Sequence, residues 1–404
     1  MTRIALTKYR VIGAVFLVLM LAGVPGVRAG SDTAPDNYPT GVRTDGDESP
    51  DNYLTWRQAR LSAALQQVLT TTVAEQPWLP GVMVAIDIPS RGVHWSGAAG
   101  VGNLQTGQPL GLKFSFRIAS ITKTFTAAAI YRLVEQGALD VRESLDQVLD
   151  ESDLELLESR GYRTDRITVE HLLSHTSGLP DYADTPEYIG EVLANPTRRW
   201  TRREQVEFAV DHFPPVGEPG KAYAYSDTGY VLLGEILERR SGLSLADVYR
   251  HVLGFRRLRL FSTWLESLEP VPPKAGPRAS QYYGDFDILA ADPSFDLYGG
   301  GGLVSTVEDL NRFITALFAG KVVRRASLAS MMTTTVDPYA GRGLFRLGNT
   351  GCWGHGGFWG VAMLHCPAEG VSMSVALTAE PGAAGSSFQL FELVGRLWAA
   401  LDLR

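Results

Sequence analysis

The chain has 404 residues, of which 45% are hydrophobic and 20% charged, so it can bury one large core or two modest ones. Its formal net charge is −7, and no basic run has the character of a binding arm. Composition and charge therefore argue against nucleic acid as a partner.

The N-terminus has the features of an export signal. Basic residues precede an apolar run over 11–24, and Val27-Arg28-Ala29 then offers a small-residue cleavage site. The run is shorter than the roughly 20 residues that span a bilayer. We therefore expect a secretory signal peptide over 1–29 and an exported protein, periplasmic or secreted. A membrane is an expected partner only if this segment stays uncleaved as an anchor.

The rest of the chain divides into four segments. Residues 30–54 are rich in Asp, Gly, Pro and Thr without periodicity, which is typical of a flexible linker. Segments 55–139 and 291–404 mix helical and strand patterns, whereas 140–290 is mainly helical with long loops. This order predicts an α+β fold with one antiparallel sheet, built from both chain ends, flanked by helices and interrupted by a helical domain. A ligand site is expected in the crevice between the two domains.

Individual elements follow from the periodicity of apolar residues and from the positions of glycine and proline. The expected helices are 56–76, 121–136, with Ser120 near its N-cap and Gly137 as its stop, 306–318 and 387–401. The expected strands are 82–88 and 93–99, joined as a hairpin, then 352–357, 361–366 and 371–378.

The only two cysteines, Cys352 and Cys366, bracket a predicted hairpin that turns near residues 358–360. In an exported protein they can form one disulfide, and two buried free thiols are the alternative. Strand alternation puts Cys352 and His355 on opposite faces. A bridge would therefore brace the hairpin from behind a site that contains His355.

Three short motifs carry candidate chemistry. Ser120-Ile121-Thr122-Lys123 places a hydroxyl and an amine one helical turn apart, so the two groups can lie side by side. Serine is a weak nucleophile until a neighbouring base takes its proton. Tyr225-Ser226-Asp227 and His355-Gly356-Gly357 follow along the chain, and the order of the three motifs carries more weight than any one of them.

This ordered set resembles the serine β-lactamase and penicillin-binding protein family, and most closely its class C β-lactamase-like branch of DD-carboxypeptidases, D-aminopeptidases and esterases. The resemblance runs from about Ala63 to Thr378 and includes Leu172–Pro180 and Gly300–Thr306. It implies a serine hydrolase that works through an acyl-enzyme without metal or other cofactor. The implied substrate is a small molecule or peptide with an ester or amide bond.

The resemblance also implies a role for each matching residue. Ser120 is the expected nucleophile, and Lys123 and Tyr225 are the expected pair that withdraws its proton. We expect the positive charge of Lys123 to lower the pKa of Tyr225, so that the phenol serves as the base. The backbone N–H groups of Ser120 and Phe358 are the expected oxyanion hole.

Two residues depart from the usual family pattern. Asp227 replaces an asparagine, and a carboxylate cannot donate an N–H to a substrate carbonyl, although it can pair with Lys123. His355 replaces the lysine of most β-lactamases, and histidine is mostly neutral at pH 7. Both changes favour a DD-peptidase-like or esterase-like activity over a true β-lactamase, and a non-catalytic penicillin-binding sensor remains the alternative of another class. The expected substrate contacts are Asp227, His355, Gly356 and Gly357.

Two other patterns carry little weight. His171 and His175 have metal-ligand spacing on a helix, but no third ligand is evident, so no metal site is predicted there. Gly299–Gly302 is glycine-rich like a phosphate loop, but it lacks the following Lys-Ser or Lys-Thr.

Overall fold

The computed structural model describes residues 50–379 and 386–401. The predicted signal peptide and residues 30–49 of the predicted linker lie outside the described residues. The first described helix, α2 (Pro50–Glu75), begins before Trp56, so residues 50–54 of the predicted linker are helical. Within the described ranges, no helix is both long and apolar enough to cross a bilayer.

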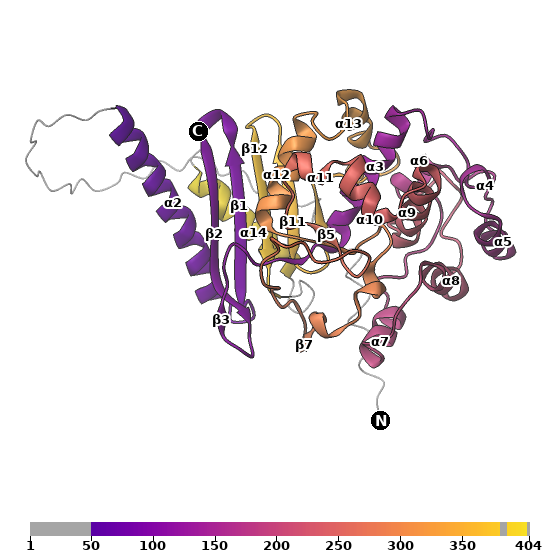
Figure 1. The fold of residues 1–404 in the computed structure, drawn as a ribbon, viewed down its shortest axis with the longest axis horizontal. Helices are drawn as coiled ribbons and strands as arrows, with labels where there is room; N and C mark the ends of the chain where they lie inside the picture. The colour runs from indigo at the N-terminus through magenta and orange to yellow at the C-terminus, as the bar shows by residue number, and fades with distance from the viewer. Residues whose placement is uncertain (1–49, 380–385, 402–404) are drawn as a thin grey trace, which may run out of the picture.

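A seven-stranded antiparallel sheet forms the body of the molecule, with strand order β3-β2-β1-β12-β11-β10-β9 (Figure 1). Strand β1 from the N-terminal part pairs with β12 from the C-terminal part, which confirms a sheet built from both ends of the chain. The strands are β1 (Gly81–Ile88), β2 (Val93–Asn103), β3 (Gln108–Pro109), β9 (Phe345–Arg346), β10 (Trp353–Gly357), β11 (Val361–Cys366) and β12 (Val371–Leu377).

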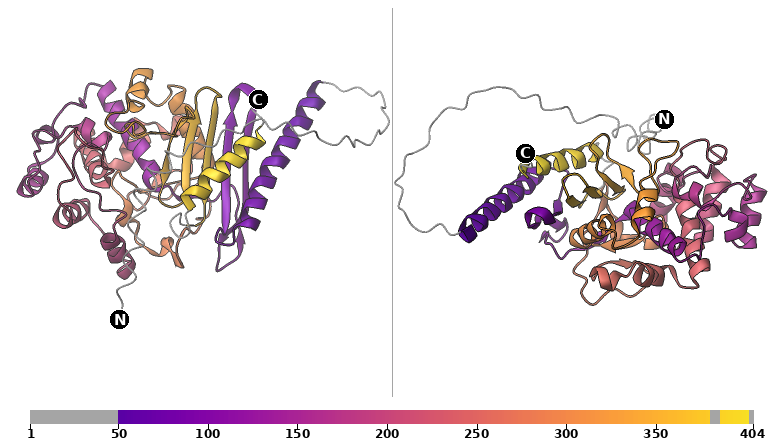
Figure 2. Two further views of the ribbon diagram at one scale, coloured as in Figure 1. Left: turned by 180° about the vertical axis from the view of Figure 1, so that it is seen from behind. Right: turned by 90° about the horizontal axis from the view of Figure 1, so that it is seen from above.

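Helices cover both faces of this sheet. Helices α2 and α14 (Ser386–Ala400) lie on one face (Figure 2), and α12 (Val307–Phe318) packs on the other. Alternation along β1 explains the two layers, because Val82 and Val84 join the core under α2 and α14 while Met83 joins the opposite core. Fully burying each such side chain contributes about 1.5–3 kcal/mol.

The predicted helical middle is also present, on the side of the sheet away from α2 (Figure 1). Its longest helix, α9 (Asp227–Ser241), packs against α3 (Thr122–Glu135) of the sheet domain. The other helices are α4 (Leu145–Val148), α5 (Glu151–Ser159), α6 (Val169–Leu173), α7 (Pro186–Ala194), α8 (Arg202–His212), α10 (Leu245–Asp247) and α11 (Phe255–Leu258), with a π-helical turn at Val248–Val252; α13 (Arg325–Met331) follows α12.

The end of the middle segment returns to the sheet domain. Strand β5 (Trp264–Leu265) pairs with β8 (Leu303–Ser305), which also pairs with β4 (Phe116–Arg117) just before the predicted nucleophile. A separate small hairpin joins β6 (Tyr282–Tyr283) to β7 (Phe286–Asp287). The three-stranded sheet thus fixes the chain on the approach to Ser120.

The disulfide between Cys352 and Cys366 is formed and lies beside the hairpin of β10 and β11. Both cysteines belong to the core under α2 and α14, so the bridge braces β10 from the face opposite His355, as the alternation predicted. The two sulfurs close a loop with a sequence separation of 14 residues.

Removing this bridge should lower the melting temperature by about 4 °C in a Cys352→Ala/Cys366→Ala variant. A loop of this length stabilises the folded state by about 3 kcal/mol, and unfolding releases about 2.1 cal/mol/K per residue. Differential scanning calorimetry measures the shift, and a reductant should produce a similar shift in the unmodified protein. An unchanged melting temperature in both experiments would contradict the bridge.

Candidate active site

Ser120 lies in a tight turn that leads into α3. A 3-10 turn, Ala119–Ile121, precedes the helix, and Ser120 directly precedes the N-cap Ile121, as expected. Ala119 adopts a positive φ of 45°, which is unusual for a residue with a Cβ and indicates local backbone strain. The preceding Ile118 donates its N–H to Leu303 of β8 at 3.0 Å, which anchors the turn.

The amine of Lys123 is completely buried and makes three hydrogen bonds. It donates to Ser120 Oγ at 3.0 Å, to Asp227 Oδ1 at 2.5 Å and to the carbonyl of Gly300 at 2.8 Å. An ammonium group has three donors, so these acceptors satisfy all of them. Lys123 is therefore a protonated partner of Asp227, and it holds Ser120 Oγ without being able to take a proton from it.

The glycines before β8, Gly299–Gly302, pack closely around the ion pair of Lys123 and Asp227. A Cβ on Gly300 would come within 2.6 Å of Asp227 Oδ1, while its carbonyl accepts from Lys123. Gly299 likewise accepts from Thr126 of α3 at 2.7 Å. The run therefore packs closely against the Lys123–Asp227 pair.

Tyr225 reaches the same serine from the loop before α9. The pKa of its buried phenol is raised well above 10, first by burial and then by the charge of Asp227, and a hydrogen bond to Ser120 lowers it in part. Lys123 Nζ lies 5.0 Å from the centre of the Tyr225 ring. Because Asp227 pairs with Lys123, the lysine does not depress the phenol's pKa, and the expected lowering was wrong. Tyr225 is a neutral phenol at neutral pH.

His175 positions Tyr225, which the sequence did not reveal. Its ring stacks on the Tyr225 ring at 4.4 Å, its carbonyl accepts from Ala224 at 2.9 Å, and its Nδ1 accepts from Ser226 at 3.1 Å. These contacts lie on both sides of Tyr225 in the chain. The sequence feature that could have indicated this role is the Leu172–Pro180 segment, which contains His175. The carbonyl of Pro180 also accepts hydrogen bonds from the hydroxyls of Ser226 and Thr228.

The structure gives the two histidines of the predicted metal-like pair separate structural roles. Nδ1 of His171 accepts from Thr168 N–H at 3.2 Å, within the capping box of α6. Nδ1 of His175 is occupied by Ser226. Their Nδ1 atoms therefore act as acceptors for backbone N–H groups at two different places.

His355 faces the site from β10 as a neutral imidazole. Burial and the nearby charge of Lys123 lower its pKa to about 3. Its Nδ1 lies 2.6 Å from the carbonyl of Gly356, so Nδ1 carries the proton and donates it there. Nε2 is then a buried acceptor without a hydrogen-bond partner among the described residues. His355 offers a substrate a lone pair and no positive charge.

Further carboxyl groups surround Asp227. Asp181 Oδ1 accepts the backbone N–H of Asp227 at 3.0 Å, and burial together with Asp227 raises the pKa of Asp181 well above its usual range. Burial and Asp227 also raise the pKa of Asp296 to about 6. Lys123 therefore lies near several carboxyl groups. Its charge lowers the pKa of Asp181 and Asp296 in part, against the effects of burial and of Asp227.

The end of β10 lies directly against the nucleophile turn. A Cβ on Gly357 would come within 2.3 Å of the carbonyl of Ile118, so this glycine is required for the close approach of the two segments. Phe358 follows Gly357 and begins the turn to β11. The predicted oxyanion hole from the N–H groups of Ser120 and Phe358, and the predicted substrate contact of Gly356, stay predictions.

The structure therefore brings Ser120, Lys123 and Tyr225 together, with Asp227 bonded to Lys123 and His355 on the neighbouring strand. A serine held by a lysine and a tyrosine, at the junction of an antiparallel sheet and a helical domain, defines a β-lactamase-like serine hydrolase. Comparison with known families agrees with this class. The family model described as Beta-lactamase matches residues 65–389, and the chain belongs to that family.

Individual relatives include a penicillin-binding protein and an aminopeptidase. Penicillin-binding protein 4* of Bacillus subtilis (strain 168) is 29% identical over 283 residues, or 65% of this chain and 58% of its own length. D-aminopeptidase of Brucella anthropi is 26% identical over 333 residues, or 78% of this chain and 59% of its own length. The chain thus spans little more than half the length of these curated relatives.

Solved structures cover the fold more completely. The D-amino acid amidase from Ochrobactrum anthropi SV3, complexed with L-phenylalanine amide, superposes with a TM-score of 0.71 at 25% identity. The match covers 85% of this chain and 98% of the amidase. The predicted family and fold class are therefore confirmed.

Proposed function

We propose that the protein is an exported hydrolase that cleaves esters or amides through an acyl-enzyme on Ser120. One observation carries the proposal: Ser120 Oγ accepts from Lys123 at 3.0 Å, and Tyr225 lies close enough to Ser120 for their side chains to interact. An activated serine needs a proton acceptor and a positive charge beside its oxygen; the small deprotonated fraction of Tyr225 supplies the first and Lys123 the second.

Proton transfer in this site runs through the phenol. Ser120 Oγ attacks the substrate carbonyl when Tyr225 is a phenolate, and the serine proton passes to the phenolate oxygen. The Lys123 ammonium stays charged and stabilises the negative charge that develops at the serine. The neutral Tyr225 then gives its proton to the leaving alcohol or amine. Water attacks the acyl-enzyme by the same proton path in reverse, releasing the acid and free Ser120.

Two charge states favour substrates without a carboxylate beside the scissile bond. His355 is neutral and presents a lone pair, and the charge of Lys123 is paired with Asp227. A penicillin or a D-Ala-D-Ala terminus carries a carboxylate that finds no cation at His355. Simple esters and amino acid amides are therefore the first candidates, in keeping with the names of the D-aminopeptidase and amidase relatives. A DD-carboxypeptidase is the second candidate, because of the penicillin-binding relative.

Export is part of the proposal. It rests on the basic and apolar segment at residues 1–29 and on the Cys352–Cys366 bridge, since disulfides persist mainly in oxidising compartments. Periplasmic or secreted location follows from both.

Adduct mapping tests the proposal directly. The purified protein is treated with a fluorophosphonate and digested, and mass spectrometry should place the adduct on Ser120. An adduct on another serine would overturn the assignment. A parallel panel of a p-nitrophenyl ester, a D-amino acid amide, a D-Ala-D-Ala peptide and a cephalosporin should show turnover fastest for the first two. Labelling of Ser120 without turnover of any member would favour a sensor instead.

A further inference from the structure

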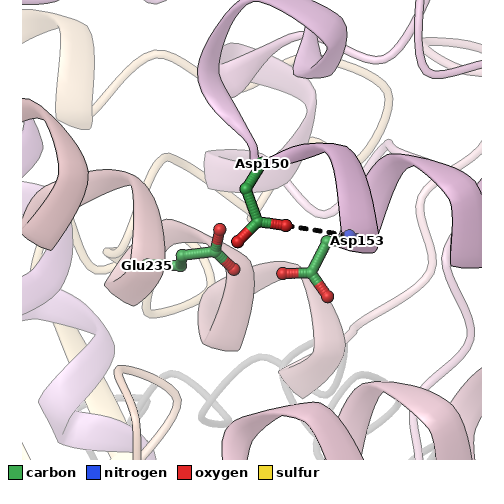
Figure 3. A group of neighbouring side chains, drawn as sticks. All are labelled: Asp150, Asp153 and Glu235. Atoms are coloured by element: carbon green, nitrogen blue, oxygen red, sulfur yellow. Dashed lines mark hydrogen bonds between the residues drawn. The ribbon is translucent and has the colours of Figure 1, made fainter.

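Three carboxylates meet in the helical domain, away from the catalytic residues (Figure 3). Asp150 is the N-cap of α5, Asp153 stands in its first turn, and Glu235 projects from the middle of α9. One oxygen from each lies within 4.8 Å of the other two. Figure 3 shows the three carboxyl groups turned toward one another.

Glu235 is the member whose ionised form has no hydrogen-bond donor within the part of the chain that the structure describes. It is only 5% exposed, and neither of its carboxylate oxygens has a hydrogen-bond partner among the described residues. A buried carboxylate without a donor costs several kcal/mol unless a positive charge or a proton compensates it. Two further acids lie beside it, and the charge of Arg202, which is hydrogen-bonded to Glu238, offsets them in part.

Two nearby arginines interact with the two aspartates of the cluster. Asp153 Oδ1 accepts from Arg203 at 3.0 Å, and Arg203 is shared with Glu207 at 2.7 Å. The guanidinium of Arg239 lies 3.8 Å from Asp150 Oδ2. These contacts orient the two aspartates, whereas no arginine of the described residues donates a hydrogen bond to Glu235.

We propose that Asp150, Asp153 and Glu235 bind a divalent cation, with Ca²⁺ as the best fit, and that the ion ties α5 to α9. All three ligands are hard oxygens, which is the donor set that Ca²⁺ prefers. Ca²⁺–oxygen bonds of about 2.3–2.6 Å span two oxygens up to roughly 5 Å apart, so the three carboxylates need only a small inward shift to share one ion. Mg²⁺, with bonds of about 2.0–2.1 Å, requires the three groups to contract.

The surroundings suit the remaining coordination of Ca²⁺. Three carboxylates supply up to six oxygens, and the Asp150 side chain is 44% exposed, so water can complete the shell. Glu235 lies two helical turns after Asp227 on α9, so the ion would fix the helix that positions the partner of Lys123. The proposal concerns stability of the helical domain and does not depend on the hydrolytic activity.

Thermal unfolding of the whole protein, stripped with a chelator and titrated with CaCl₂, tests the site. Calcium at about a hundred times its dissociation constant should raise the melting temperature by roughly 3–4 °C. Burial and Asp153 raise the pKa of Glu235 to about 8, so a proton competes and the measurement belongs at pH 8.5. Isothermal titration calorimetry should show one site, with MgCl₂ binding more weakly.

Variants locate the ion. Glu235→Gln should abolish the calcium shift while keeping or raising the calcium-free melting temperature, because it removes a buried charge. Asp150→Asn preserves the helix cap and should weaken calcium binding at least tenfold. Asp211→Asn, on α8 and paired with Arg160, should respond to calcium like the unmodified protein. No shift or binding heat at 10 mM in the unmodified protein, or a full shift in Glu235→Gln, would overturn the proposal.

Discussion

Ser120→Ala should lower kcat for the best ester or amide substrate by about 10⁴–10⁶, to the rate left by binding and polarisation of the substrate alone. The substitution removes the atom that Lys123 and Tyr225 both contact, while leaving their own positions unchanged. The lysine keeps its bonds to Asp227 and Gly300, so the fold should persist. Single-turnover kinetics should also show the loss of the acyl-enzyme phase.

Ser177→Ala is the matched control for this experiment. Ser177 is buried, and among the described residues its hydroxyl accepts only a local N–H, from Leu179 at 3.3 Å. The control should retain turnover close to that of the unmodified protein. Turnover in Ser120→Ala within tenfold of the unmodified protein would remove Ser120 from the mechanism. Circular dichroism melts of both variants separate a chemical loss from a folding loss.

Much of the site was predictable because its signals are local or are fixed by simple pairing rules. Ser120 and Lys123 are one helical turn apart, so their contact needs only a helix. Cys352 and Cys366 lie opposite each other because a hairpin with a short turn determines its own register. The sheet itself followed from strand patterns at the two ends of the chain.

Other features depend on packing between distant segments, which spacing does not encode. His175 fixes Tyr225 only because the chain after α6 folds against the start of α9. Burial and then the charge of Asp227 raise the pKa of Tyr225, and no sequence pattern ranks these two effects against the charge of Lys123. Glu235 likewise meets the start of α5 only in the folded protein.

Asp227→Asn should raise kcat/KM at pH 7–8, by roughly 3- to 30-fold. In the unmodified protein burial and the Asp227 charge hold the pKa of Tyr225 well above 10, so log kcat/KM should climb with a slope near one between pH 6 and pH 9. Asparagine keeps an acceptor oxygen for Lys123 but removes the negative charge. The pKa of Tyr225 then falls, and each unit of that fall increases the phenolate fraction about tenfold at a fixed lower pH. The rising limb of the pH profile should therefore move to lower pH.

The sign of this change distinguishes two roles for Asp227. If its charge acts only by raising the pKa of Tyr225, Asp227→Asn should increase activity and shift the pH profile. Turnover of amides should increase as well, because asparagine can donate a hydrogen bond to a substrate carbonyl. If Asp227 instead accepts the proton of Lys123 during the reaction, the variant should lose activity at every pH. Asp184→Asn is the control, because Asp184 is another partly buried carboxyl near Asp227. The acids that raise the pKa of Tyr225 are Asp227 and Asp181. A loss of more than tenfold in Asp227→Asn, with Asp184→Asn unchanged, would contradict the charge argument and assign the carboxylate a direct part in proton transfer.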